Sequence, residues 1–233
     1  MKTILTTAAL AAIFAAGGGW LVTQGMAPAS DSTSFSLPGA ANAQEAGAAD
    51  QDGAESSVEI TEMIKGDIDA PVEIIEYASY TCPHCANFAQ TVLPEIEENY
   101  IKTGKAKLVY RDVYFDKYGM WASLVARCQP EKFFGISDMI YSTQNDWLRQ
   151  DSEEGIADGL RKIGLMAGIG KDQLDACLTD GDKLRALVEW YQANATRDNI
   201  KSTPSFIIDG KPYSNMTYAD FAEVLDEHLA DAE

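Results

Sequence analysis

The feature that most constrains the fold is the stretch EYASYTCPHCANF, residues 76 to 88, in which two cysteines stand between a strand and a helix. The preceding residues, APVEIIEYASY, begin with a proline and are rich in β-branched and aromatic side chains, which predicts a buried strand. Apolar side chains then recur at helical spacing from Phe88 to Tyr100, and Pro94 is expected to kink that helix. A second strand is expected at Ala106 to Val113. This order predicts a parallel strand pair joined by a right-handed helical crossover.

The rest of the sequence separates into a helical block and a return to strand. Residues 120 to about 199 carry apolar patterns at helical spacing. The stretch TPSFIIDGKPY then predicts a hairpin of two strands joined by an Asp-Gly turn at 209–210. The last apolar pattern predicts a closing helix that is capped by Asn215 or Thr217. His228, near the end of that helix, is expected to be solvated or to act as a mild charge partner of the helix C-terminus.

An N-terminal segment precedes these elements. Lys2 is followed by an almost uninterrupted apolar run from Ile4 to Val22, which is typical of an export signal or a membrane anchor. Cleavage and retention are both compatible with the sequence, and either delivers the rest of the chain outside the cytoplasm, to the periplasm. The predicted organisation is a signal peptide or anchor at 1–29, a flexible linker at 30–57, an α/β domain in two parts at 58–118 and 200–233, and a helical insertion at 119–199.

The charge of the chain limits its partners. The formal net charge is −18, from 36 acidic and 18 basic residues. A phosphate backbone attracts the opposite sign, so we expect no nucleic-acid partner. The excess of carboxylates instead predicts a soluble surface, and protein molecules that carry it should repel one another.

The pair Cys82 and Cys85 could hold a metal, close a structural loop or perform redox chemistry. A structural zinc site needs four ligands, commonly from two such pairs, whereas Cys128 and Cys177 each stand alone in helical sequence. A purely structural bridge between Cys82 and Cys85 would close a very short loop, which constrains the unfolded chain least. We therefore predict redox chemistry at this pair, with no metal and no cofactor.

The first cysteine of the pair is expected where an anion is stabilised. At the N-terminus of a helix, unpaired N–H groups and the macrodipole favour the Cys82 thiolate and lower its pKa. Pro83 suits the first helical turn, and His84 adds a second donor and, when protonated, a positive charge. Cys85 lies one turn further in and is less exposed. Stabilising the thiolate stabilises the dithiol form, so the disulfide becomes a stronger oxidant.

A wider pattern supports this chemistry. CPHC after a strand, a helical insertion and a later Thr203-Pro204 before a strand together resemble the DsbA family of thiol oxidants, over roughly residues 58 to 233. The resemblance implies a thioredoxin-like fold with an inserted helical domain. It also implies that the Thr203-Pro204 bond is cis, packs against the active-site disulfide and lies where the backbone pairs with an extended substrate. Pro83, Thr203 and Pro204 are the substrate-binding residues expected from it.

Glu76 stands six residues before Cys82, where the family has a buried acid. Strand alternation supports its burial, because Glu76 shares a face with Val72 and Ile74, whereas Glu73 lies on the opposite face. The expected role is catalytic: a carboxyl with a raised pKa that accepts or relays protons during exchange. The alternative is a solvated carboxylate at the end of a strand.

Cys128 and Cys177 both fall in the predicted insertion. A structural disulfide, a second redox pair and two free buried thiols are all compatible with their positions. Some DsbA relatives from alphaproteobacteria carry such a pair, so the resemblance favours the structural disulfide between Cys128 and Cys177.

These features predict an exported thiol:disulfide oxidoreductase that introduces disulfide bonds into reduced envelope proteins through Cys82 and Cys85. The resemblance implies a membrane quinone-linked thiol oxidase as the partner that reoxidises it. A disulfide isomerase or reductase of the same fold is the alternative, and a non-enzymatic binding module is a third. The spacer at 23–57 is too short and too polar for the dimerisation module that isomerases of this superfamily usually add, so we expect a monomer.

Overall fold

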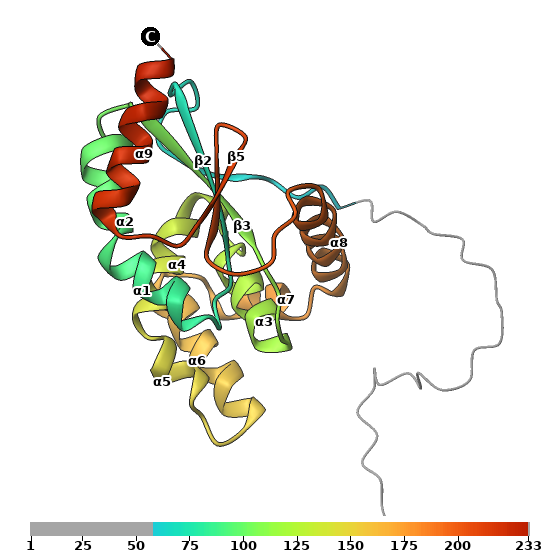
Figure 1. The fold of residues 1–233 in the computed structure, drawn as a ribbon. Coiled ribbons are helices and arrows are strands. Elements are labelled where there is room, and N and C mark those ends of the chain that lie inside the picture. Colours follow the sequence, from blue (N-terminus) through green and yellow to red (C-terminus); the bar gives the residue numbers. More distant parts are fainter. Residues whose placement is uncertain (1–57, 233) are drawn as a thin grey trace, which may run out of the picture. The chain divides into compact units, whose positions relative to one another are not determined.

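The computed structural model describes residues 58 to 232, which form one compact unit around a five-stranded sheet (Figure 1). The strand order is β1-β3-β2-β4-β5, in which β2 and β3 are parallel and the other neighbours are antiparallel. The strands are β1 (Met63–Lys65), β2 (Val72–Ala78), β3 (Ala106–Asp112), β4 (Ser205–Ile208) and β5 (Lys211–Ser214). The predicted α/β class and the parallel pair are confirmed, while β1 is a three-residue strand that no sequence pattern indicated.

The crossover between β2 and β3 is broken near Pro94, as predicted. Helix α1 (Pro83–Thr91) ends before Val92, and α2 (Leu93–Ile96) carries the proline in its first turn. A π-helical turn, η1 (Glu97–Ile101), follows. The break follows from the missing N–H of proline and the clash of its ring with the preceding turn.

The segment between β3 and β4 is helical in the described chain, as predicted. Its elements are α3 (Lys117–Ala126), the 3-10 turn η2 (Pro130–Lys132), α4 (Phe133–Ser142), α5 (Gln144–Leu148), α6 (Glu153–Met166), α7 (Lys171–Leu178) and α8 (Gly181–Arg197). Helix α3 begins at Lys117, two residues before the predicted insertion. Asp116 caps it by accepting hydrogen bonds from the backbone N–H groups of Tyr118 and Gly119.

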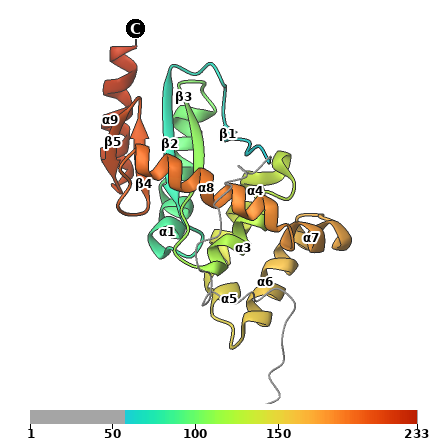
Figure 2. The same ribbon diagram turned by 90° about the vertical axis from the view of Figure 1, so that its right-hand side faces the viewer.

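Helix α8 packs on both the insertion and the sheet. Its first half packs on α3, where Leu187 meets Leu124, and its second half covers the sheet, where Tyr191 and Ala195 meet Tyr77. Figure 2 shows α8 crossing in front of β2 and β3. The predicted insertion, which ends at residue 199, therefore includes a helix that also packs on the sheet. Apolar periodicity identifies the buried face of a helix but not the surface that this face covers.

The other face of the sheet is covered by α1, α2 and the closing helix α9 (Tyr218–Asp231), which Figure 1 places on the side opposite α8. The core on this face includes Phe88, Phe206 and Phe221, whose ring centroids lie 4.7 to 6.0 Å apart. Thr217 caps α9 by accepting a hydrogen bond from the Asp220 N–H, which confirms one of the two predicted caps. This core fixes the position of α1 on the sheet.

The hairpin of β4 and β5 turns at Asp209 and Gly210, whose φ angles of +42° and +82° suit the predicted two-residue turn. The expectation that His228 is solvated is wrong. Its ring is 5% exposed, and it hydrogen-bonds to Asp209 at 2.9 Å and to Tyr213 at 3.0 Å. The helix pattern placed His228 near a C-terminus but could not show that the hairpin folds back over that end.

Between residues 58 and 232, no helix combines the length and apolar character needed to cross a bilayer. The predicted signal or anchor at 1–29 and the predicted linker at 30–57 lie outside the described residues.

Candidate active site

The predicted cysteine pair lies where β2 ends and α1 begins. Cys82 is the N-cap residue, with extended backbone angles of −83° and 120°, and Pro83 is the first helical residue. The chain turns tightly before it, because the Cys82 N–H donates to the Ser79 carbonyl at 3.1 Å. The sulfur of Cys82 therefore faces the unpaired N–H groups of the first turn of the helix.

Both thiols are free, and both are largely removed from solvent. Cys82 is 8% exposed, while Cys85 is fully buried. The Ser79 N–H donates to the Cys85 sulfur at 3.5 Å, and the Cys82 thiol donates to the Thr203 carbonyl at 3.5 Å. An incoming sulfur can therefore reach Cys82 but not Cys85.

The surroundings shift the pKa values of the two thiols in opposite directions. A hydrogen bond from the Cys85 thiol is the main cause that lowers the pKa of Cys82 to about 5, and Thr203 and the backbone N–H groups of Cys85 and His84 act in the same direction against burial. Burial, together with the hydrogen bond given to Cys82, raises the pKa of Cys85 far above its ordinary value. At neutral pH the dithiol form thus carries a thiolate at Cys82 and a thiol at Cys85.

His84 is the second residue of α1. Its side chain is exposed, and its backbone N–H is one of the groups that lower the pKa of Cys82. Pro83 is also exposed, at the rim of the site where a substrate would approach.

The Thr203-Pro204 peptide bond is cis, and it lies against Cys82, as the resemblance implied. β4 begins at the next residue and pairs with β2, which holds this loop beside the start of α1. The Thr203 hydroxyl oxygen is buried and has no hydrogen-bond partner in the described part of the protein. It can therefore donate to a thiolate at Cys82.

Glu76 is buried in the sheet, on the face that strand alternation predicted. It is 2% exposed, and its Oε1 atom has no hydrogen-bond partner among the described residues. Burial raises the pKa of Glu76 to about 8, with Lys65 acting in the opposite direction. Glu76 in turn raises the pKa of Cys85 electrostatically.

Two residues that sequence reasoning missed fasten the loop before Cys82. Gln144, at the start of α5, donates through Nε2 to the carbonyls of Tyr80 at 2.8 Å and Cys82 at 3.1 Å. The Thr81 hydroxyl donates to Asp116 at 2.8 Å. Gln144 comes from the insertion and Asp116 is the N-cap of α3, and nothing in their local sequence distinguishes them from ordinary helix-terminal residues.

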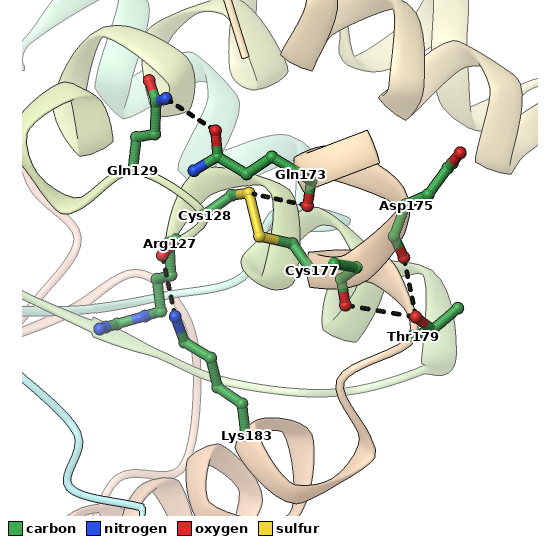
Figure 3. Close-up of a disulfide and its surroundings, with 9 residues drawn as sticks. Arg127, Cys128, Gln129, Gln173, Asp175, Cys177, Thr179 and Lys183 are labelled. Carbon is green, nitrogen blue, oxygen red and sulfur yellow. Dashed lines mark hydrogen bonds between the residues drawn. A yellow bond between two sulfur atoms is a disulfide. The ribbon is translucent and has the colours of Figure 1, made fainter. Parts of the chain in front are cut away.

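Cys128 and Cys177 form the predicted disulfide, with their Cα atoms 5.7 Å apart (Figure 3). It links Cys128, two residues beyond the last residue of α3, to the last turn of α7. Figure 3 also shows Gln129 reaching Gln173 and Lys183 reaching the Arg127 carbonyl around it. The bond thus joins two parts of the insertion. Within residues 58–232, no group of three or more Cys, His, Asp or Glu side chains is arranged to hold a metal ion.

A thioredoxin-like sheet, a dithiol at the N-terminus of the first helix and a cis-proline loop beside it define a class of proteins that exchange thiols and disulfides. Comparison with known families agrees: the model of the thioredoxin family matches residues 58–227. The chain therefore belongs to the thioredoxin family.

The chain is also similar to individual proteins. "Putative protein-disulfide oxidoreductase" of Rickettsia bellii is 27% identical over 177 residues, which cover 75% of this chain and 67% of the relative. "Disulfide bond formation protein D" of Bacillus subtilis is 25% identical over 166 residues, which cover 69% of this chain and 72% of the relative. The crystal structure of Wolbachia pipientis alpha-DsbA1 matches with a TM-score of 0.67 at 24% identity, covering 73% of this chain and 92% of that one.

The chain spans 62 to 67% of the length of the Rickettsia relatives that it matches. The predicted resemblance to alphaproteobacterial DsbA proteins and the thioredoxin-like fold are confirmed. The predicted class of enzyme, a thiol:disulfide oxidoreductase, is the class to which the named relatives belong.

Proposed function

We propose that this chain is an exported thiol:disulfide oxidoreductase that works as a dithiol oxidase on reduced envelope proteins. The observation that carries the proposal is the contrast between the two thiols, since the pKa of Cys82 is about 5 and that of Cys85 is far above neutral. A stabilised thiolate makes the dithiol form the preferred one, which favours transfer of the disulfide to a substrate.

The cycle follows from the exposure of the two sulfurs. A substrate thiolate attacks Cys82, the bond between Cys82 and Cys85 breaks, and Cys85 leaves as a thiolate that takes a proton from Glu76. A second substrate thiolate then attacks the substrate sulfur of the mixed disulfide and expels Cys82 as a thiolate. The substrate loses two electrons and gains a disulfide, and the protein gains two electrons as a dithiol.

The surroundings of Cys82 suit an unselective substrate site. The backbone before Pro204 lies against the sulfur, and a strand-like substrate pairing there would be bound mainly through its main chain. The partner that restores the disulfide is proposed to be a membrane quinone-linked thiol oxidase, and the compartment is proposed to be the periplasm. The protein is proposed to act as a monomer.

The test is stoichiometric oxidation of a reduced, unfolded substrate. We expect the oxidised protein to yield about one substrate disulfide for each molecule, and Cys82→Ser to yield none. Cys85→Ser should also yield none; offered a substrate disulfide instead, it should accumulate a mixed disulfide, because the Cys82 thiolate breaks the substrate disulfide and the buried thiol that would resolve the product is missing. No gain of substrate disulfides would exclude the oxidase role, and efficient rescue of a scrambled substrate by the dithiol form would favour an isomerase.

A further inference from the structure

Gln144, at the start of α5, holds the backbone of the loop that carries Cys82. It is 6% exposed, and its Nε2 atom donates to the Tyr80 carbonyl at 2.8 Å and to the Cys82 carbonyl at 3.1 Å. A side-chain amide has two hydrogen atoms on its nitrogen, so one group can hold two carbonyls at once. We refer to these two hydrogen bonds as the carbonyl clamp. Both go to the backbone and neither to a sulfur, so the clamp acts on the position of Cys82.

The Cys82 carbonyl lies where the loop meets α1. It accepts the Ala86 N–H at 3.2 Å, which is the first bond of the helix, while the Cys82 N–H donates to Ser79 within the loop. In the described part of the chain, the hydrogen bond from Gln144 therefore ties the Cys82 backbone to the insertion. The carbonyl belongs to the peptide unit that follows Cys82. Holding it fixes the extended ψ of 120° that makes Cys82 the N-cap.

The helix that carries Gln144 is itself held in place. Trp147, near the end of α5, is 2% exposed and donates through its indole N–H to the Ile140 carbonyl of α4 at 2.8 Å. Helix α6 approaches the same residue at Gly159, where a Cβ atom would stand 2.9 Å from the Cβ atom of Trp147. Because α5 is packed this closely against α6 and bonded to α4, it presents the amide of Gln144 from a fixed position.

The two residues before Cys82 are held by other contacts. The Tyr80 hydroxyl pairs with that of Ser137 on α4 at 2.7 Å, and the Thr81 hydroxyl donates to Asp116 at 2.8 Å. Both contacts use side chains, whereas the carbonyl clamp uses the backbone. Loss of the clamp would therefore leave the loop attached at these two side chains and would release the Cys82 backbone in particular.

The importance of the clamp differs between the two redox forms. In the disulfide form, the covalent bond to Cys85 holds the Cys82 sulfur over the first turn of α1. In the dithiol form that bond is absent, and both thiols are free in this structure. The sulfur then stays beside the backbone N–H groups of His84 and Cys85 only while Cys82 keeps its N-cap geometry. The clamp therefore stabilises the dithiol form more than the disulfide form.

We propose that Gln144 is a positioning residue that keeps Cys82 at the start of α1 whenever the bond between Cys82 and Cys85 is open. The inference rests on the proposed exchange function. No bond forms or breaks at Gln144, and neither electrons nor protons pass through it. By favouring the dithiol form over the disulfide form, the clamp makes the disulfide a stronger oxidant. The insertion thus takes part, through one amide, in setting the redox equilibrium of the site.

The test is Gln144→Met, because methionine has a similar length and volume but no N–H donor. Two quantities are measured on the full chain: the equilibrium constant with glutathione, and the thiolate absorbance of the dithiol form against pH. We expect the equilibrium to shift about tenfold toward the disulfide form, which is about 30 mV for this two-electron couple. The midpoint of Cys82 ionisation should rise by about one pH unit, the same factor of ten. A purely structural residue would change the unfolding midpoint and neither of these quantities.

Gln90→Met is the matched control. Gln90 lies on α1, and its Nε2 atom also donates to two carbonyls, those of Ala86 at 3.1 Å and Tyr141 at 3.2 Å. It therefore ties α1 to α4 by the same kind of fork, but it does not bond the loop of residues 79–82. We expect this variant to keep the native equilibrium and the native midpoint. An equal shift in both variants would overturn the inference, because the effect would then come from loosening α1.

Gln144→Asn covers the case in which Gln144→Met does not fold. It keeps an amide in the site, but its side chain is one methylene shorter and cannot hold both carbonyls from the same backbone position. We expect a shift in the same direction. Native equilibrium and native midpoint in the folded variants at position 144 would overturn the inference while leaving the exchange function standing. A native protein that does not exchange with glutathione at all would instead sink the proposed function, and the thiolate titration would still decide the role of Gln144.

Discussion

The molecule contains two cysteine pairs, and they stand at opposite ends of helices. Cys82 caps the N-terminus of α1, where N–H groups favour an anion. Cys128 follows the C-terminal end of α3, and Cys177 lies in the last turn of α7, where carbonyl groups disfavour one. The first pair is held as free thiols of different acidity, and the second is bonded. The comparison teaches that the surroundings of Cys82, the hydrogen bond from Cys85 first and the N–H groups of the helix start after it, favour a thiolate there.

The two regions also differ in what they contribute to stability. The active site contains a buried acid, Glu76, whose Oε1 atom has no hydrogen-bond partner among the described residues, which costs free energy of folding. The insertion contains a disulfide that closes a sequence separation of 49 residues, which restricts the unfolded chain. The exchange site therefore weakens the fold, and the second disulfide strengthens it.

The largest expected difference between the pairs is in reduction potential. We expect the couple of Cys82 and Cys85 to be more oxidising than that of Cys128 and Cys177 by roughly 100 mV or more, at about 30 mV for each 1.4 kcal/mol of difference. Equilibration in graded thiol buffers, with alkylation of each cysteine followed by mass spectrometry, measures both couples in one sample. Reduction of the two pairs at the same buffer ratio would show that their reduction potentials are equal, which contradicts this expectation.

Glu76→Gln tests how far the buried acid lowers the free energy of unfolding. A carboxyl whose pKa is raised from 4.5 to about 8 destabilises the fold progressively as pH rises between those values, because the unfolded chain ionises first. The variant should therefore match the native protein near pH 4 and exceed its free energy of unfolding at pH 8 by up to about 5 kcal/mol, at about 1.4 kcal/mol per unit of pKa. Denaturant unfolding of the dithiol form at several pH values measures this.

Glu73→Gln is the control for that experiment, because Glu73 lies on the same strand and is solvated, with an ion pair to Lys107 at 3.4 Å. It should change the free energy of unfolding by less than about 1 kcal/mol at any pH. A Glu76→Gln effect that does not vary with pH would show that Glu76 is not the buried neutral acid described here.

A smaller effect is expected from Cys128→Ala/Cys177→Ala. Loss of the loop constraint should lower the free energy of unfolding by up to about 4 kcal/mol on chain-entropy grounds. Exchange by the remaining pair should persist, since Cys82, Thr203 and Glu76 are untouched. Unfolding midpoints and glutathione exchange measure the two properties separately, and loss of exchange in a folded variant would show that the second disulfide supports the first site.

Sequence was a good guide wherever the signal was local. Pro83 at the start of α1, Pro94 at its break, the turn at Asp209 and Gly210, and the cap at Thr217 each reflect a backbone preference of a few neighbouring residues. The burial of Glu76 likewise followed from alternation along one strand.

The missed features depend on contacts between segments far apart in the chain. Gln144 reaches the Cys82 carbonyl across 62 residues, and the pairing of Tyr110 with Tyr141 needs α4 to pack on the sheet. The position of α8 and the burial of His228 are of the same kind. Periodicity identifies the apolar face of a helix or strand but not the segment that packs against it. These features could therefore be seen only in the folded structure, where the insertion packs on the sheet.

The central claim is that the Cys82 sulfur ionises far below the ordinary range of a thiol. Ultraviolet absorbance of the thiolate, followed from pH 3 to pH 10 in the dithiol form, measures this directly, with Cys82→Ser as the blank. We expect a single transition with a midpoint near pH 5, as the pKa of Cys82 requires. A midpoint near the ordinary thiol value of about 8.5 would contradict the account.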